Sequence, residues 1–342
     1  MQEFFNVKLM ITQQMAGRLG EMSGPTLAGV SRYNRNLVLD DGQHLMTFDL
    51  GGTLGIDQKS TGVRNPSITA MNYMKYDFAS LNKNDLSNIS KLRRALGFSI
   101  PPFMSCNLVH PLTKEPFFGE PYLMLNIKGM KVAVLGAYAG PSDVSDAVKS
   151  IYPSDKKLTD STAASKNSGD EYTGAGSSWN MIESRYKKLN LNHRSRKNAS
   201  SSEEPIVHIS KIAPAIRRTL RYIYDNEETD YVIAILSNYD DSKKELLDDL
   251  EGVGIVITGG EVDDDVVSKD TSERHMADQI PKGGDIPLYH HHHSGYVMSI
   301  DIEFKRRMTS FEYIGHTVKQ MNQEIAANSD DLNLVDQIYY HL

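Results

Sequence analysis

The chain of 342 residues has very little cysteine and no long hydrophobic run. Its one cysteine, Cys106, excludes an intramolecular disulfide and is typical of a reducing compartment. A membrane-spanning helix needs about 20 consecutive apolar residues, and the sequence contains no such run. The first segment, MQEFFNVKLMITQQ, also lacks the basic start, the apolar core and the cleavage site of a secretory signal. We therefore expect a soluble, cytoplasmic protein without a membrane partner.

An overall excess of positive charge is also missing. The chain has 37 Lys and Arg residues against 44 Asp and Glu residues, so its formal net charge is −7. This charge does not favour non-specific binding of nucleic acid by the whole surface. The segment 185–197 is a local exception and leaves a nucleic-acid-associated protein as one alternative. Its basic residues are Arg185, Lys187, Lys188, Arg194, Arg196 and Lys197.

Short apolar runs of strand length alternate with segments of helical periodicity. Such alternation predicts a mixed α/β protein with a layered core. Strands are predicted at 7–12, 37–39, 78–82, 131–139, 230–238, 254–260 and 295–304. Helices are predicted at 66–76, 209–225 and 242–252.

A change in composition divides the chain into segments. Residues 140–205 are rich in Ser, Asn, Lys, Asp and Gly, which indicates a partly flexible insertion. We therefore expect residues 1–139 and 206–304 to form two halves of one core. The remaining residues, 305–342, are predicted to form a helical tail.

Characteristic polar segments follow several of these strands, in a fixed order. They are TQQMAG (12–17), DDGQ (40–43), AMNYMKYDFASLNKND (70–85), FMSCN (103–107), DYVIAILSNYDD (230–241) and GIVITGGEV (254–262). This series resembles the metallophosphoesterase domain of the 5′-nucleotidase family, the calcineurin-like phosphoesterases. The resemblance implies a four-layer α/β/β/α sandwich and covers most of the chain outside the insertion.

The resemblance fails at the family's metal-binding positions. Its patterns T-N-D-x-H-G, D-x-G-D and G-N-H-D/E supply carboxylates and imidazoles to two divalent metals, which activate water for attack on a phosphate ester. By this resemblance Gln14 replaces an Asp, Gln43 the bridging Asp and Asn238 a His. Further replacements are Ala16 for His, Lys83 for the ligating Asn, Asn84 for the catalytic His, and Gly260 and Val262 for the last two His residues. We therefore expect a non-catalytic protein that needs no metal cofactor.

The residues left at these positions are candidates for a polar pocket. Such a pocket would suit a phosphorylated ligand, with positive charge from Lys83 and Arg18; an alternative is a closed cleft whose amides satisfy one another. The protein would act as a binding or regulatory module for a protein or a phosphorylated small molecule, and a homodimer is compatible with this role. The candidates are Gln14, Arg18, Gln43, Lys83, Asn84, Asp85, Asn107 and Asn238.

A second alternative is an active phosphoesterase with a relocated metal site. Its ligands would come from Asp40, Asp41, His44, Asp85 or the histidines 290–293, with His290 and His292 as the most suitable pair. The alternative for residues 290–293 is an exposed loop beside the cleft, without a metal. The acidic run 263–265 is interpreted in the same way, as a solvated loop.

Overall fold

The computed structural model describes residues 3–20, 24–37, 43–55, 65–87, 89–141, 148–150, 207–239, 246, 250–260, 288–292, 296–308 and 310–327. The chain divides into two compact units, 1–151 with 205–342, and 152–204. The second unit lies within the predicted insertion and outside the described residues, as does the basic segment 185–197. Among the described helices, none has the length and apolar character needed to span a membrane.

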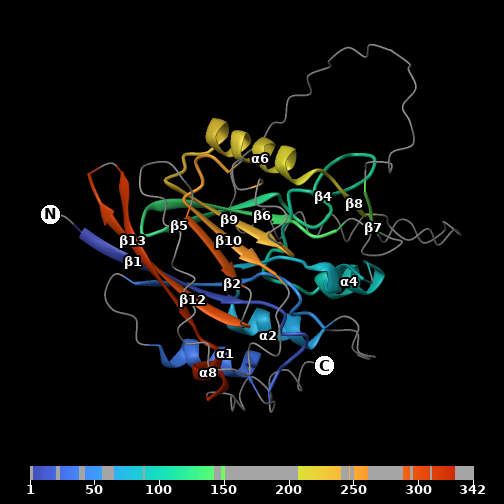
Figure 1. Ribbon diagram of the computed structural model, residues 1–342, viewed down its shortest axis with the longest axis horizontal. Helices are drawn as coiled ribbons and strands as arrows, with labels where there is room; N and C mark the ends of the chain where they lie inside the picture. The colour runs from blue at the N-terminus through green and yellow to red at the C-terminus, as the bar shows by residue number, and fades with distance from the viewer. Residues whose placement is uncertain are drawn as a thin grey trace, which may run out of the picture. The chain divides into compact units, whose positions relative to one another are not determined.

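Two five-stranded sheets organise the first unit (Figure 1). The first sheet has the order β13-β12-β1-β2-β3, in which β1, β2 and β3 are parallel and β12 and β13 are antiparallel neighbours. Its strands are β1 (Glu3–Thr12), β2 (His44–Asp49), β3 (Phe78–Ala79), β12 (Val297–Arg306) and β13 (Phe311–Gln320).

The second sheet has the order β11-β10-β9-β6-β5, with β6, β9, β10 and β11 parallel. Its strands are β5 (Tyr122–Ile127), β6 (Met130–Tyr138), β9 (Tyr231–Ser237), β10 (Ile255–Gly259) and β11 (Leu288–His292). A small third sheet joins β4 (Leu108–Val109), β8 (Val207–Ile209) and β7 (Val148–Ser150).

Apolar side chains between the sheets form the central layer of the core. Leu9 and Phe48 from the first sheet are buried in one cluster with Val134, Ile235 and Ile257 from the second. Because side chains alternate along a strand, the opposite faces of both sheets need cover from helices.

Helices provide this cover on both outer faces. Leu27 and Met71, from α1 and α2, join a cluster with Met10 of β1, whereas Ile216 of α6 packs with Ala133 and other residues of the second sheet. The α/β/β/α order of layers predicted from the sequence is therefore confirmed. The helices are α1 (Leu27–Asn36), α2 (Pro66–Met74), α3 (Lys83–Leu86), α4 (Ile89–Leu96), α6 (Ile212–Asn226) and α8 (Asn322–Ala326).

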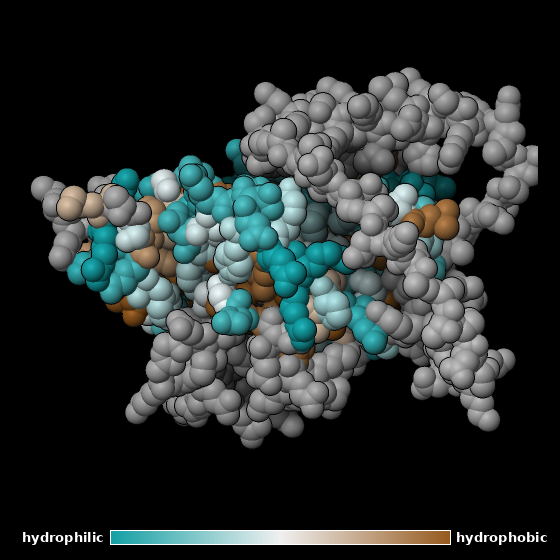
Figure 2. All heavy atoms as spheres, turned by 90° about the horizontal axis from the view of Figure 1, so that it is seen from above, coloured by the Kyte–Doolittle hydropathy of each residue, from teal (hydrophilic) through white to brown (hydrophobic). Residues whose placement is uncertain are grey.

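Helix α6 agrees with the helix predicted from the spacing of its apolar residues. Ile216, Leu220 and Ile223 recur at helical spacing and are buried. Seen from the α6 side, the coloured surface is mostly hydrophilic (Figure 2), as expected when the apolar stripe of the helix faces the sheet.

Two segments differ from their predicted structure. Of the strand predicted at 37–39, Leu37 is the C-cap of α1, and the other residues lie outside the described part of the chain. The second strand of the first sheet is β2 at His44–Asp49. The tail is not helical throughout, because Phe311–Gln320 forms β13; among its described residues, the helical ones are Asn322–Ala326. The β-branched and aromatic residues of 311–320 pair with β12 in an antiparallel hairpin, a cross-strand arrangement that a short window of sequence does not show. The predicted helix at 242–252 falls mostly outside the described residues.

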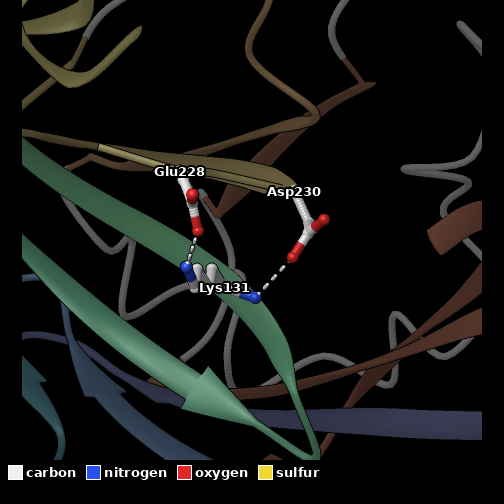
Figure 3. A network of polar contacts seen from close by, with 3 residues as sticks. All are labelled: Lys131, Glu228 and Asp230. Carbon is white, nitrogen blue, oxygen red and sulfur yellow. Dashed lines mark hydrogen bonds and ion pairs between the residues drawn. The ribbon is translucent and has the colours of Figure 1, made fainter. Parts of the chain in front are cut away.

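A polar network joins the beginning of β6 to the segment before β9 (Figure 3). The Lys131 backbone N–H donates to Asp230 Oδ2 at 2.7 Å, and the Lys131 ammonium pairs with the Glu228 carboxylate. Because both side chains of the ion pair are exposed, water screens their attraction, and the backbone contact is what fixes this end of the strand pair.

Candidate functional site

Loops from both sheets meet at the C-terminal ends of their parallel strands. The loop after β1 runs beside the loop after β2: the backbone N–H groups of Gln14, Ala16 and Gly17 donate to the carbonyls of Gly51, Gly52 and Thr53 at 2.8–3.1 Å. The Gln14 side chain then crosses to the second sheet and donates from Nε2 to the Gly260 carbonyl at 2.7 Å. This is the edge where parallel α/β sheets place their ligand sites.

The loops after β3 and β9 complete this group. Asn238, directly after β9, accepts a hydrogen bond at Oδ1 from the Lys83 backbone N–H at 3.1 Å. Ser237 Oγ donates to the Leu81 carbonyl at 2.6 Å. The structure therefore brings together four of the positions singled out by resemblance, Gln14, Lys83, Asn238 and Gly260, through direct contacts.

Gln43 does not join them, and its assignment is corrected. Strand β2 begins at His44, so Gln43 precedes the strand instead of following it. The segment that does follow β2 is Asp49-Leu50-Gly51-Gly52, on which the pattern D-x-G-D falls with Gly52 in the bridging-acid position. The signal was present in the sequence, since HLMTFD is a strand-like run before DLGG. The shorter run NLVL before DDGQ gives a similar pattern, which is why the sequence alone favours Gln43.

Close packing fills the space at Gly52. A Cβ atom at this glycine would lie 3.1 Å from the Cα atom of Gln14 and well inside contact distance of Asn82 Nδ2. Gly52 has φ +77°, a conformation that glycine adopts without steric cost. The Asn82 side chain is fixed, because its Oδ1 atom accepts the backbone N–H groups of Asn84 and Asp85 at 2.9 and 3.1 Å. An acidic side chain at position 52 therefore has no room.

Two carboxylates lie behind this packed region. Asp49 is 1% exposed and accepts hydrogen bonds from the hydroxyls of Thr12 and Thr53 at 2.7 and 2.5 Å and from the Gly51 N–H at 2.9 Å. Burial raises the pKa of Asp49 to about 7, the nearby charge of Asp85 adds to the rise, and the hydrogen bonds oppose it.

Asp85 is also buried and accepts hydrogen bonds from backbone groups of the protein. Its Oδ2 atom accepts the backbone N–H groups of Gly52 at 2.6 Å and Asn82 at 3.1 Å, and the second of these bonds completes the capping box of α3. Both carboxylates thus hold the backbone of the loops 49–53 and 82–85 in place.

Asn107 and Arg18, predicted to line the pocket, have other contacts. Asn107 is fully buried, and its amide bonds both the N–H and the carbonyl of Tyr138 at 2.8 and 2.7 Å, so it joins the third sheet to β6. Arg18 donates to the Tyr296 hydroxyl at 3.0 Å, and its guanidinium lies 4.3 Å from the ring centroid of the same residue. Asn84 is exposed on α3.

The histidine run does not form the loop expected from the sequence. His290 and His292 belong to β11, where they pair with Ile257 and Gly259 of β10. His44 cannot share a metal ion with Asp85, because His44 begins β2 whereas Asp85 contacts the loop after that strand, roughly 16 Å further along. Asp40, Asp41 and the acidic run 263–265 lie outside the described residues.

The donor set that the described residues offer at the strand ends does not fit two divalent metals. Such metals need several carboxylate or imidazole ligands with open lone pairs. Here the amides of Gln14 and Asn238 and the carboxylates of Asp49 and Asp85 hold protein groups, and Lys83 brings an ammonium. Within the described residues, no group of three or more His, Cys, Asp or Glu side chains is placed to hold a metal ion.

Backbone strain marks the same loops. Gln14, Ala16 and Asn238 have φ of 49°, 46° and 57°, in the left-handed region that costs most residues about 1 kcal/mol. Asparagine tolerates this region well, whereas glutamine and alanine do not. Strain of this kind gathers at places where the surrounding structure dictates the backbone path.

Replacing Ala16 by glycine is therefore expected to stabilise the protein. The Ala16 side chain is exposed, so its removal loses no packing, and the gain is about 0.5–1 kcal/mol in the free energy of unfolding. Urea denaturation measures the change. The comparison is Ala213→Gly in the first turn of α6, where the backbone is right-handed and the half-buried methyl group packs on the core, so this substitution should destabilise the protein by up to about 1 kcal/mol. Destabilisation by both substitutions would contradict the left-handed strain at Ala16.

Known structures share this architecture, although the sequence matches no protein-family profile and no curated protein. The calcineurin-like phosphoesterase YfkN from Bacillus subtilis aligns with TM-score 0.57 and 14% identity, over 99% of each chain. A 5′-nucleotidase precursor from Thermus thermophilus aligns with TM-score 0.59 and 12% identity, over 98% of this chain and 58% of its own. The sulfate thiohydrolase SoxB from the same organism gives 0.59 and 11%, over 98% and 60%.

These likenesses concern the fold, since every identity is below 15%. The chain spans little more than half the length of the nucleotidase and the thiohydrolase. The sheets and helical layers nevertheless agree with the family that the sequence segments indicated. The chain therefore has the fold of the calcineurin-like phosphoesterases and 5′-nucleotidases.

Proposed function

We propose that this protein is a non-catalytic member of this fold that serves as a binding module and works without bound divalent metals. The observation that carries the proposal is the packing of Gly52 against Gln14 and Asn82, because Gln14 and Gly52 stand at positions that the resemblance assigns to metal ligands. Without such ligands, no water can be activated for attack on a phosphate ester in the manner that the resemblance implies.

The backbone N–H groups of these loops favour the alternative of a closed cleft, because their hydrogen-bond partners lie inside the protein. The first N–H groups of α3 are bonded to Asn82 and Asn238, and those after β1 are bonded to the loop after β2. A phosphate group would have to displace these bonds to reach the backbone. Recognition of a protein partner elsewhere on a rigid scaffold is the function that this arrangement favours.

Metal content and turnover test the proposal together. Untagged protein is incubated with manganese, desalted and analysed by mass spectrometry, and the same sample is assayed on a generic phosphodiester and on nucleoside monophosphates. We expect substoichiometric metal and no turnover above the buffer rate. Tightly held metal with turnover that a chelator abolishes would overturn the proposal.

A further inference from the structure

Exposed apolar side chains lie in α2 and just after α4, two helices that Figure 1 labels. Ile100 is 57% exposed, Phe98 41% and Tyr73 40%. Tyr73 is in α2, whereas Phe98 and Ile100 follow α4. Large apolar side chains that gather in this way on a soluble protein mark an interaction site more often than isolated ones do.

Hydrogen bonds hold the two parts of this surface together. Asn72, the neighbour of Tyr73 in α2, donates from Nδ2 to the Phe98 carbonyl and accepts at Oδ1 from the Ile100 N–H, both at 2.8 Å. The Ser99 N–H donates to the Leu96 carbonyl at 3.0 Å, which fixes the turn that leaves α4. The apolar side chains are therefore presented by a bonded backbone, and little ordering is needed when a partner binds.

The exposed charged side chains that α2, α4 and the turn after α4 contribute to this surface have one sign. Within the described residues of 71–100, the exposed charged side chains are Lys75, Lys91, Arg93 and Arg94. The two acids of this stretch are turned to the protein: Asp77 accepts the Thr47 N–H at 2.9 Å, and Asp85 is buried. A cationic surface on a chain of net charge −7 is a local feature that selects an acidic partner.

We propose that the surface formed by Tyr73, Phe98, Ile100, Lys75, Lys91 and Arg94 binds an acidic amphipathic segment of a partner protein. Apolar side chains of the partner would cover Phe98 and Ile100, and its carboxylates would meet the surrounding cations. Nucleic acid is a poorer match, because the most exposed of the three apolar side chains is the aliphatic Ile100, which offers no stacking face. The inference rests on the proposed binding function and names the partner class for it.

Peptide binding to the full chain tests this assignment. The probe is a fluorescein-labelled helical peptide of about 16 residues with Glu on one face and Leu on the other, and its control carries Lys in place of Glu. We expect the acidic peptide to bind and the basic peptide not to bind. Ile100→Ser and the pair Lys91→Glu/Arg94→Glu should each weaken binding at least about tenfold.

Matched substitutions elsewhere on the protein distinguish binding at this surface from an effect of the overall charge. The pair Arg217→Glu/Arg221→Glu on α6 makes the same change of charge, and Ile314→Ser on β13 removes another exposed apolar side chain. Both controls should leave the dissociation constant unchanged. Equal losses for the two charge pairs, or tighter binding of a labelled single-stranded oligonucleotide to the same residues, would overturn the proposal. The metal and turnover results would stand in either case, because none of these residues lies in the strand-end loops.

Discussion

Replacing Gly52 by aspartate is expected to destabilise the protein by about 3 kcal/mol, from overpacking together with left-handed strain. The new Cβ atom would overlap the Asn82 side chain, which two backbone hydrogen bonds hold in place. Asn82→Gly alone removes the side-chain cap of α3 and should cost only a few tenths of a kcal/mol, because glycine is itself tolerated at an N-cap. The double variant Gly52→Asp/Asn82→Gly lacks the Asn82 side chain that the new aspartate would overlap. Its loss in the free energy of unfolding should therefore be about 1–3 kcal/mol smaller than the sum of the two single losses.

The neighbouring glycine, Gly51, provides the control for this comparison of single and double variants. A Cβ atom at Gly51 would lie 2.6 Å from the backbone nitrogen of Asn82, an atom that Asn82→Gly does not remove. Gly51→Asp should therefore be destabilising and should not be rescued. Urea denaturation of all variants gives the coupling energies. Additive losses for Gly52→Asp and Asn82→Gly would show that these two side chains do not compete for one space.

The free energy of unfolding of Asp49→Asn should fall less steeply with rising pH than that of the unchanged protein. Burial raises the pKa of Asp49 from 3.8 to about 7, so between these values the native state holds a proton that the unfolded chain has released. Stability from this group is therefore lost as the pH rises through the window. The slope that the substitution removes is at most about 1.4 kcal/mol per pH unit.

The amide can replace the carboxyl group in the same contacts. Asn Oδ1 would accept the Gly51 N–H, and Nδ2 would donate to the hydroxyls of Thr12 and Thr53, which can turn to accept. Unfolding curves at several values from pH 4 to 8 measure the difference between the two proteins. Asp77, whose pKa burial raises to about 6, contributes to both curves and cancels. Parallel curves would mean that Asp49 ionises in the folded protein as it does in the unfolded chain.

Much of the fold could be predicted from the sequence because its signals are local. The buried strands β6, β9 and β10 are continuous apolar runs, and α6 carries its apolar residues at helical spacing. Strand β13 was missed because its stability comes from pairing with β12 and from packing of Tyr313 near Phe304 and Tyr231. Such cross-strand partners are invisible to a short sequence window.

At the candidate site, the sequence by itself determined the residue types: amides, alanine, glycine and a lysine stand where the resemblance calls for metal ligands. Only the tertiary structure decided what occupies that space. The pairing of β2 with β1 fixes where β2 ends, and Gly52, not Gln43, therefore stands at the position of the metal-bridging acid. The tertiary structure also placed Asn82 against Gly52 and tied Gln14 and Asn238 to loops of the other strands. Contacts between residues far apart in the chain arise from packing, and residue types alone do not specify them.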